Sequence, residues 1–187
     1  ALEGLLGLLR EANARINLVS RATIGGPDLV DRHLLDSLLG LRFLPPGKGA
    51  LLDIGSGGGF PALPLLIVRR DLSGHLFEAT GKKARFLEET SRALGLTVEI
   101  VNARFPGSFP MNRPPRFDVL TTRAVADAGD LVRAARPLLR PGARALLWTT
   151  EPLLREIRRR DEGIHKIEFH RAPGAESRGI AVLESST

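Results

Sequence analysis

The chain has 187 residues, of which 43% are hydrophobic, and a formal net charge of +6. This length predicts one packed domain, and the apolar share is typical of a globular protein. Cysteine is absent, which excludes disulfides and thiolate metal sites and fits a reducing cytoplasm. Neither a run of about 18 apolar residues nor a charged-then-apolar leader occurs, so we expect no membrane span and no signal peptide.

The basic balance is the first feature that bears on a partner. Lysine and arginine number 27 against 21 acidic residues, and the isoelectric point is near 10.8. Such a surplus favours an acidic partner such as nucleic acid. Only four of the basic residues are lysine, however, and an arginine excess equally fits a genome-wide composition. Charge alone therefore leaves the partner open.

The first quarter of the chain has a helical pattern. Leu2, Leu5, Leu6 and Leu9 form one apolar stripe, and a second stripe follows between residues 30 and 41. Pro45-Pro46-Gly47 then ends the pattern. We predict an N-terminal helical extension over 1–46, packed on a core over 47–187, with both in a single domain.

The rest of the chain alternates between apolar strands and amphipathic helices. We predict strands at 50–54, 75–78, 98–101, 117–121, 143–148, 166–170 and 179–184, and helices at 61–70, 82–94, 128–139 and 153–160. The segment 105–116 contains four prolines and is predicted to be a loop. Strands that alternate with helices predict an α/β fold: a doubly wound, mostly parallel, seven-stranded Rossmann-like sheet, with the last two strands antiparallel.

A glycine-rich turn joins the first predicted strand to the first helix of the core. It contains Asp53, Gly55, Gly57, Gly59 and Phe60. Glycines at this turn let the backbone approach a ligand closely. A dinucleotide fingerprint requires a third glycine at the position of Phe60, so a dehydrogenase is disfavoured. An acid before the glycines and a bulky residue after them suit an ammonium-bearing amino acid, as in S-adenosylmethionine.

A second acid supports a nucleoside cofactor. Glu78 ends the second predicted strand, 19 residues after Gly59, where a carboxylate can accept both ribose hydroxyl protons. It could instead pair with Lys82 or Lys83. Asp118, in the fourth predicted strand, is either an acid that faces the site or an ordinary residue at the start of a strand.

Three polar residues share one face of the N-terminal helix. His33, Asp36 and Ser37 are spaced by three and four residues. They either brace the site and touch substrate or form a helix–domain hydrogen-bond cluster. The other histidines show no ligand spacing, so no metal is expected. Lys82 and Lys83 belong to a basic cluster suited to phosphate contacts, although such a cluster is also a common solvated helix face.

The ordered set of motifs resembles the small-subunit ribosomal RNA methyltransferase G family, also called glucose-inhibited division protein B. The resemblance runs from about Leu5 to Leu147 and is most specific at two places: His33 to Leu38 before the glycine loop, and Arg123 to Ala126 after the fourth strand. It also rests on the segments 16–20, 53–61, 81–87, 117–119 and 137–142.

The resemblance implies S-adenosylmethionine-dependent methylation of guanine N7 in 16S ribosomal RNA, as the free RNA or a small-subunit precursor. It implies that Gly55 and Phe60 line the methionine and ribose side of the cofactor. Phe105 and Pro106 would flank the adenine, and Arg123 would reach the cofactor and orient the substrate. An arginine can pair with guanine O6, but it is permanently protonated and therefore cannot act as a base. We expect a cytoplasmic monomer.

The chain departs from the family pattern at the end of its third strand. Arg104-Phe105-Pro106 stands where the family usually has Arg-Ala-Glu, and Pro106 cannot donate a backbone hydrogen bond. Two alternatives therefore stay open. One is a methyltransferase of the same fold with another substrate, and the other is a non-catalytic RNA-binding relative.

Overall fold

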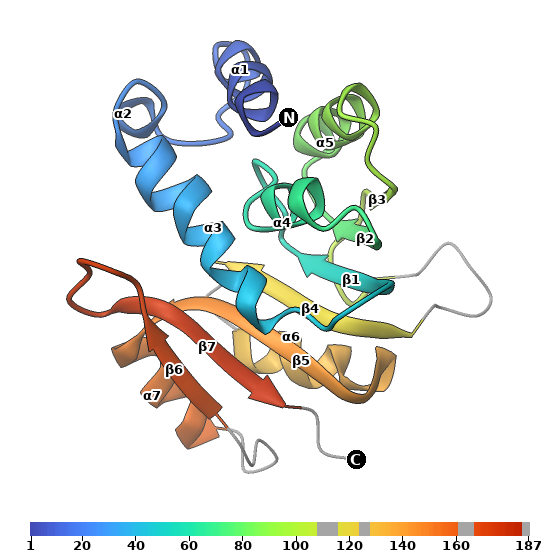
Figure 1. Cartoon of the computed structure of the whole chain (residues 1–187), viewed down its shortest axis with the longest axis vertical. Helices are drawn as coiled ribbons and strands as arrows, with labels where there is room; N and C mark the ends of the chain where they lie inside the picture. Colours follow the sequence, from blue (N-terminus) through green and yellow to red (C-terminus); the bar gives the residue numbers. More distant parts are fainter. Residues whose placement is uncertain (108–115, 124–127, 161–166, 185–187) are drawn as a thin grey trace.

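A seven-stranded sheet forms the centre of the molecule (Figure 1). The computed structural model describes residues 1–107, 116–123, 128–160 and 167–184. The strand order is β3-β2-β1-β4-β5-β7-β6. The strands are β1 (Gly49–Ile54), β2 (Leu72–Phe77), β3 (Val98–Val101), β4 (Phe117–Arg123), β5 (Leu139–Thr150), β6 (Ile167–Arg171) and β7 (Arg178–Glu184).

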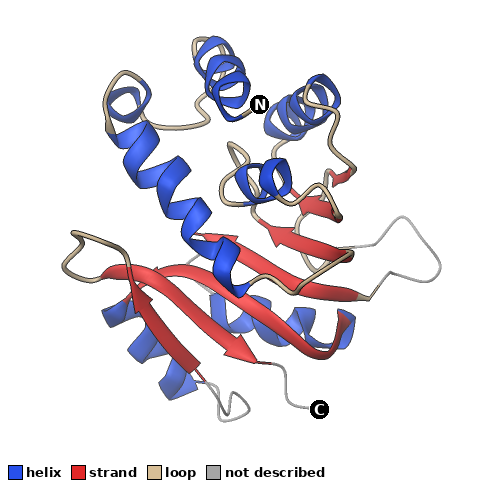
Figure 2. Ribbon diagram, in the orientation of Figure 1, coloured by secondary structure: helices blue, strands red, loops and turns tan. Residues whose placement is uncertain are grey.

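Helices cover both faces of this sheet (Figures 1 and 2). One face carries α1 (Leu2–Asn13), α4 (Ala62–Val68) and α5 (Gly81–Ala93), together with the helical segment of residues 29–43. The opposite face carries α6 (Ala128–Ala135) and α7 (Glu151–Arg160). Each face buries its own apolar cluster, with Leu63 and Leu87 in one and Leu120 and Ile157 in the other. The predicted fold class is confirmed.

The strand pairing explains where a ligand can bind. The first five strands are parallel, whereas β7 runs antiparallel to both β5 and β6. Along β1, Leu51 to Ile54 are all buried, as expected for a strand covered on both faces. The chain order reverses between β1 and β4, and ligands in open α/β sheets bind outside the carboxyl ends of the strands at this point.

The N-terminal residues form several short helices where the sequence predicted a largely helical segment. After α1, the Asn13 carboxamide oxygen accepts the N–H groups of Leu18 and Val19, each at 2.9 Å, which stabilises a turn. Ser20 then caps α2 (Arg21–Ile24). The following segment comprises η1 (Leu29–Leu35, π-helical), α3 (Asp36–Leu38) and η2 (Leu39–Phe43, 3₁₀-helical).

Close packing holds the helical segment of residues 29–43 against the sheet. The Trp148 indole N–H donates to the Asp36 carbonyl at 2.8 Å. Gly40 is required beneath this ring, because a Cβ atom there would lie 2.7 Å from the indole. Leu5 and Leu9 of α1 are fully buried in the same apolar cluster as the sheet residues. The division into 1–46 and 47–187 remains a prediction.

Most predicted elements are confirmed with shifted ends. The predicted helix 128–139 was too long: α6 ends at Ala135 and a 3₁₀ turn, η3 (Arg136–Leu138), follows, since Pro137 has no N–H to continue the helix. β5 then begins at Leu139 rather than Ala143. In the predicted loop 105–116, residues 108–115 lie outside the described part of the chain.

Candidate active site

The glycine loop follows the carboxyl end of β1 and is bent by three left-handed glycines. The φ angles of Gly55, Gly57 and Gly59 are 76°, 54° and 88°. At Gly59 a Cβ atom would lie 2.8 Å from Leu63 Cγ, so this glycine allows helix α4 to pack on the loop. Around Gly57, by contrast, only the Gly55 carbonyl oxygen lies within 4 Å of a Cβ position. The backbone at Gly57 is thus open to a ligand.

Glu78 binds the glycine loop. One carboxylate oxygen accepts the Gly57 N–H at 2.8 Å and the other accepts the Thr80 N–H at 2.7 Å. The residue is 7% exposed. It lies just after β2 and does not pair with Lys82 or Lys83 in the described contacts. Each carboxylate oxygen has a second lone pair. Ribose binding by Glu78 therefore stays a prediction, compatible with its role in holding the loop.

Asp53 is a buried carboxylate at the same edge of the sheet. Thr121 donates its hydroxyl to Oδ1 at 2.5 Å, whereas Oδ2 is buried without a hydrogen-bond partner among the described residues. Burial raises the pKa of Asp53 to about 6, while the neighbouring hydroxyls of Ser56 and Thr121 act in the opposite direction. An unpartnered, buried acceptor beside a glycine loop suits a cationic group such as the ammonium of S-adenosylmethionine.

A cavity of about 300 Å³ opens next to the loop. The Phe105 ring, 7% exposed, lines it and packs edge-on against Phe77 at 5.3 Å. Its other lining residues are Ile54, Gly55, Ala79, Ala103, Arg104 and Leu131. Pro106 is exposed and is not part of this lining. The departure from the family pattern thus leaves an aromatic wall at the cavity.

Arg123 ends β4 and turns towards the N-terminal helical segment. Its guanidinium donates to the Arg32 carbonyl oxygen and lies 3.9 Å from the Asp36 carboxylate. The same Asp36 oxygen forms an ion pair at 2.9 Å with Arg178, the first residue of β7. Burial raises the pKa of the Asp36 carboxyl, while both arginines lower it. The structure therefore brings Arg123 and Asp36 together and adds Arg178 to them.

His33 and Ser37 lie in the same region. Burial, followed by the positive charge of Arg123, lowers the pKa of His33 to about 4, so the imidazole is neutral at pH 7. The His33 ring lies 5.3 Å from the Phe60 ring of the glycine loop. Ser37 is fully buried and donates its hydroxyl to the His33 carbonyl at 2.5 Å. Ser37 therefore has a structural contact, whereas His33 contacts the loop directly.

Three other candidates, one aspartate and two lysines, lie outside this cluster. Asp118 lies at the opposite edge of the sheet, where it accepts the Ala50 N–H at 2.8 Å and pairs with Arg140 at 2.6 Å. It is therefore a strand-start residue and not a site acid. Lys82 and Lys83 lie in the first turn of α5, four and five residues after Glu78, and Lys82 is exposed.

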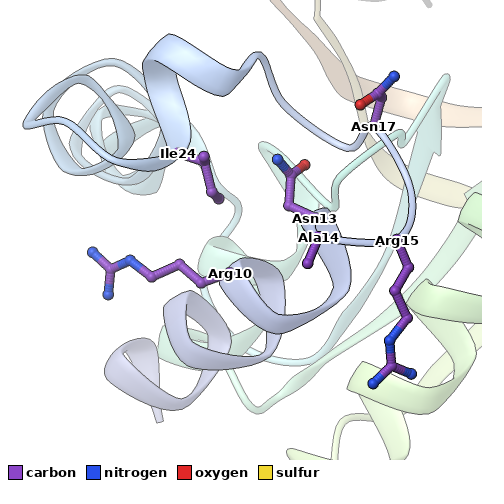
Figure 3. Close-up of a pocket in the computed structure, with 6 residues that line it drawn as sticks. All are labelled: Arg10, Asn13, Ala14, Arg15, Asn17 and Ile24. Carbon is purple, nitrogen blue, oxygen red and sulfur yellow. The ribbon is translucent and has the colours of Figure 1, made fainter.

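A second hollow, of about 610 Å³, lies between α1 and α2 (Figure 3). It is lined by Arg10, Asn13, Ala14, Arg15, Asn17 and Ile24. The chain between these two helices also contacts the glycine loop, because a Cβ atom on Gly58 would lie 3.5 Å from the Leu18 carbonyl oxygen. The chain segment that lines part of the hollow therefore also contacts the candidate cofactor site.

Within 1–107, 116–123, 128–160 and 167–184, no group of three or more histidine and acidic side chains is placed to hold a metal ion. In the same part of the chain, no helix has the length and apolar character needed to cross a membrane.

Comparison with known proteins decides the family. A model of the GidB family, described as rRNA small subunit methyltransferase G, matches residues 1–173. The chain belongs to this family. A ribosomal RNA small subunit methyltransferase G from Halorhodospira halophila is 38% identical over 184 residues, covering 97% of this chain and 84% of that protein. The Roseiflexus sp. GidB relative is 36% identical, covering 94% of this chain and 78% of that protein.

Solved structures support the same fold at lower identity. A methyltransferase from Pyrococcus furiosus aligns with a TM-score of 0.68 and 14% identity, over 82% of this chain and 83% of that one. An S-adenosylmethionine-dependent O-methyltransferase from Thermotoga maritima aligns with a TM-score of 0.67 and 17% identity, over 82% and 65% respectively. The GidB sheet is therefore that of a methyltransferase fold.

Sequence reasoning missed one charged residue of this region. Arg178 is 55 residues from Arg123, and its neighbours Glu176 and Ser177 give no motif. Only the antiparallel pairing of Thr150 with Arg178 brings it to the carboxyl end of β5, next to Arg123 and Asp36. Thr121 was missed for a similar reason: its contact with Asp53 depends on the pairing of β1 with β4.

Proposed function

We propose that this protein is an S-adenosylmethionine-dependent methyltransferase that methylates N7 of a guanine in 16S ribosomal RNA. One observation carries the proposal: the open Gly57 backbone, the Glu78 carboxylate and the unpartnered Asp53 oxygen meet at the carboxyl ends of β1 and β2. These groups suit a nucleoside joined to an amino acid. Membership of the GidB family supports the ribosomal RNA substrate, which would place the protein in the cytoplasm.

The proposed cofactor contacts follow from the chemistry of each group. The cavity beside Phe105 would hold the adenine, since an aromatic ring can pack against a purine. Glu78 would accept the ribose hydroxyl protons through its remaining lone pairs. Asp53 and the glycine backbone would hold the amino-acid end, with Phe60 closing it. Pro106, which lies outside the cavity lining, would contribute least.

The reaction needs no general base. When bound, S-adenosylmethionine supplies a sulfonium methyl group; the guanine N7 lone pair forms the new N–C bond as the S–C bond breaks, and no proton is removed. The protein therefore acts by alignment, which can lower a barrier by roughly 7–11 kcal/mol at best. Arg123 would orient the guanine by donating to O6, and its permanent charge excludes a role as a base.

RNA would approach over the basic residues near this edge. Lys82 lies exposed in the first turn of α5, and Arg10 and Arg15 line the hollow between α1 and α2 (Figure 3). Arg15 shares a weak, exposed ion pair with Glu11 at 3.7 Å. Long cationic side chains of this kind contact phosphates and contribute affinity without sequence specificity.

Mapping of modified nucleotides tests the proposal most directly. The protein is incubated with labelled S-adenosylmethionine and unmodified 16S ribosomal RNA or small subunits, and the RNA is digested and analysed by mass spectrometry. We expect a single N7-methylguanine, absent when a Gly57→Val variant is used. Methyl transfer to another base or to protein would replace the proposed substrate. Calorimetry with S-adenosylmethionine and with NAD separates a methyltransferase from a non-catalytic relative and from a dehydrogenase.

A further inference from the structure

The described residues of the cluster around Asp36 carry an uncompensated positive charge. Asp36 lies between Arg123 and Arg178, so one carboxylate forms ion pairs with two guanidinium groups. His33 adds no charge at pH 7, because its pKa is lowered to about 4 by burial and by Arg123. The nearby Arg32 forms its own ion pair with Asp28 at 3.0 Å. Counted over the part of the chain that the structure describes, the cluster therefore carries one positive charge more than its carboxylate can neutralise.

Donor groups in the cluster are also left over. Arg178 Nε lies 2.9 Å from the Asp36 carboxylate in an ion pair that lacks hydrogen-bond geometry. The Arg178 side chain is 37% exposed, and no contact of its two terminal nitrogens is found in the described residues. A guanidinium has five N–H donors in a planar fork, so the terminal edge of Arg178 remains available for a second, bidentate partner. The Nη1 atom of Arg123 is buried and has no hydrogen-bond partner within the same described segments. A buried donor without a partner is costly unless a ligand supplies one.

The cluster adjoins the candidate cofactor site. Arg123 ends β4 and pairs with Trp148, and Arg178 pairs with Thr150 two residues further along β5. Both arginines lie close enough to His33 to lower its pKa, and the His33 ring contacts Phe60 of the glycine loop. The spare donors thus lie beside the place where cofactor and substrate would meet.

We propose that Arg178 acts with Arg123 as an oxyanion site, which binds a phosphodiester group of the substrate RNA or the carboxylate of the cofactor. Both ligands offer paired oxygens that match the planar fork of an arginine. Asp36 is the positioning residue: its shared carboxylate orients both guanidinium groups. This inference rests on the proposed function for the identity of its ligands, but not for the presence of the site.

The test uses Arg178→Gln in the full-length protein, with Arg140→Gln as the matched control. Arg140 likewise pairs with one aspartate, Asp118, but at the opposite edge of the sheet. Affinity for 16S ribosomal RNA is measured by filter binding over a range of salt, and affinity for S-adenosylhomocysteine by calorimetry. We expect Arg178→Gln to lower the affinity for one of the two ligands about tenfold to a hundredfold. Arg140→Gln should change neither affinity.

The two arms identify the source of the oxyanion. If Arg178→Gln lowers the affinity for RNA and reduces the slope of log K against log salt by about 1, the ligand is a phosphate. If the variant lowers the affinity for S-adenosylhomocysteine and leaves the affinity for RNA unchanged, the ligand is the cofactor carboxylate. A wild-type protein that binds cofactor but not RNA contradicts the proposed function, and the calorimetric arm then decides this inference alone.

A purely structural role of Arg178 has a different signature. If Arg178 only neutralises Asp36, the double variant Arg178→Gln with Asp36→Asn should recover the lost affinity, because no unpaired carboxylate remains. Recovery, or unchanged affinity for both ligands in Arg178→Gln, overturns the proposal. Arg178→Lys should recover only part of the affinity, since lysine keeps the charge but lacks the planar fork. Thermal unfolding of each variant accounts for losses caused by misfolding.

Discussion

The Glu78 carboxylate accepts the backbone N–H of Gly57 at 2.8 Å, which ties the end of β2 to the middle of the glycine loop. Glu78→Ala removes this acceptor and the proposed ribose contacts together. We expect affinity for S-adenosylmethionine, measured by calorimetry, to fall by roughly 1–3 kcal/mol. Glu88→Ala, an exposed position on α5, is the control. An unchanged affinity in Glu78→Ala would remove this carboxylate from the cofactor site.

Two glycines of the loop should respond differently to substitution. At Gly57 a side chain meets almost no protein atoms, so Gly57→Val should fold, at a cost of about 1–2 kcal/mol for its positive φ, and lose cofactor binding. At Gly59 the new Cβ meets Leu63 and φ is 88°. Gly59→Ala should therefore lower the free energy of unfolding by about 2–5 kcal/mol. Urea titration and calorimetry measure both; tight cofactor binding by Gly57→Val contradicts the site.

Asp53 predicts a pH dependence of stability. Burial raises its pKa to about 6, well above the ordinary value of an aspartate, so the folded state binds the proton more tightly than the unfolded chain. Stability should therefore increase as pH falls from about 6 towards 4, and the penalty of the buried charge is fully present above about 6. Its size is at most about 3 kcal/mol. Asp53→Asn should be more stable at pH 7.5 and lose this dependence.

The measurement for Asp53 is thermal unfolding between pH 4 and 8, with the exposed Asp31→Asn as control. Because an amide cannot carry the negative charge that suits an ammonium group, Asp53→Asn should also bind S-adenosylmethionine more weakly. An identical pH profile in wild type and Asp53→Asn would show that another group is responsible.

Arg123→Lys tests the proposed mechanism. Lysine keeps the charge but lacks the planar fork, so most activity should be lost although the protein folds. Single-turnover rates of the wild type should stay flat between about pH 6.5 and 9, because guanine N7 needs no base and because the raised pKa of Asp53 and the lowered pKa of His33 both lie below that range. Cofactor affinity is measured alongside. A steep rise through one ionisation would point to an acceptor that must lose a proton.

RNA affinity should depend strongly on salt. For about four phosphate contacts to single-stranded RNA, the slope of log K against log salt should be near −3. Arg10→Gln, at the hollow between α1 and α2, should reduce the slope by about 1 if that hollow contacts phosphate. Arg133→Gln on α6, on the opposite face of the sheet, is the control. A flat plot for the wild type would contradict a nucleic-acid substrate.

Local sequence patterns predicted much of the fold. The alternation of apolar strands and helices predicted all seven strands, because burial on both faces of a parallel sheet leaves continuous apolar runs in the sequence. The glycine loop was also readable, since left-handed φ angles at Gly55, Gly57 and Gly59 favour glycine at those positions. Element ends were less accurate where local rules conflict, as at Pro137, which ended α6 early.

The tertiary structure decided what each charged group meets. The sequence shows that Asp118 and Asp53 both lie in predicted strands, but only the strand direction places Asp118 at the edge away from the site and Asp53 at the edge beside it. Likewise, Asp36 and Arg178 are brought to 2.9 Å by the pairing of β5 with β7 and by the docking of the helical segment on Trp148. Propensity and periodicity act over a few residues, whereas these contacts join residues that are 68 to 142 positions apart, and only the folded packing specifies them.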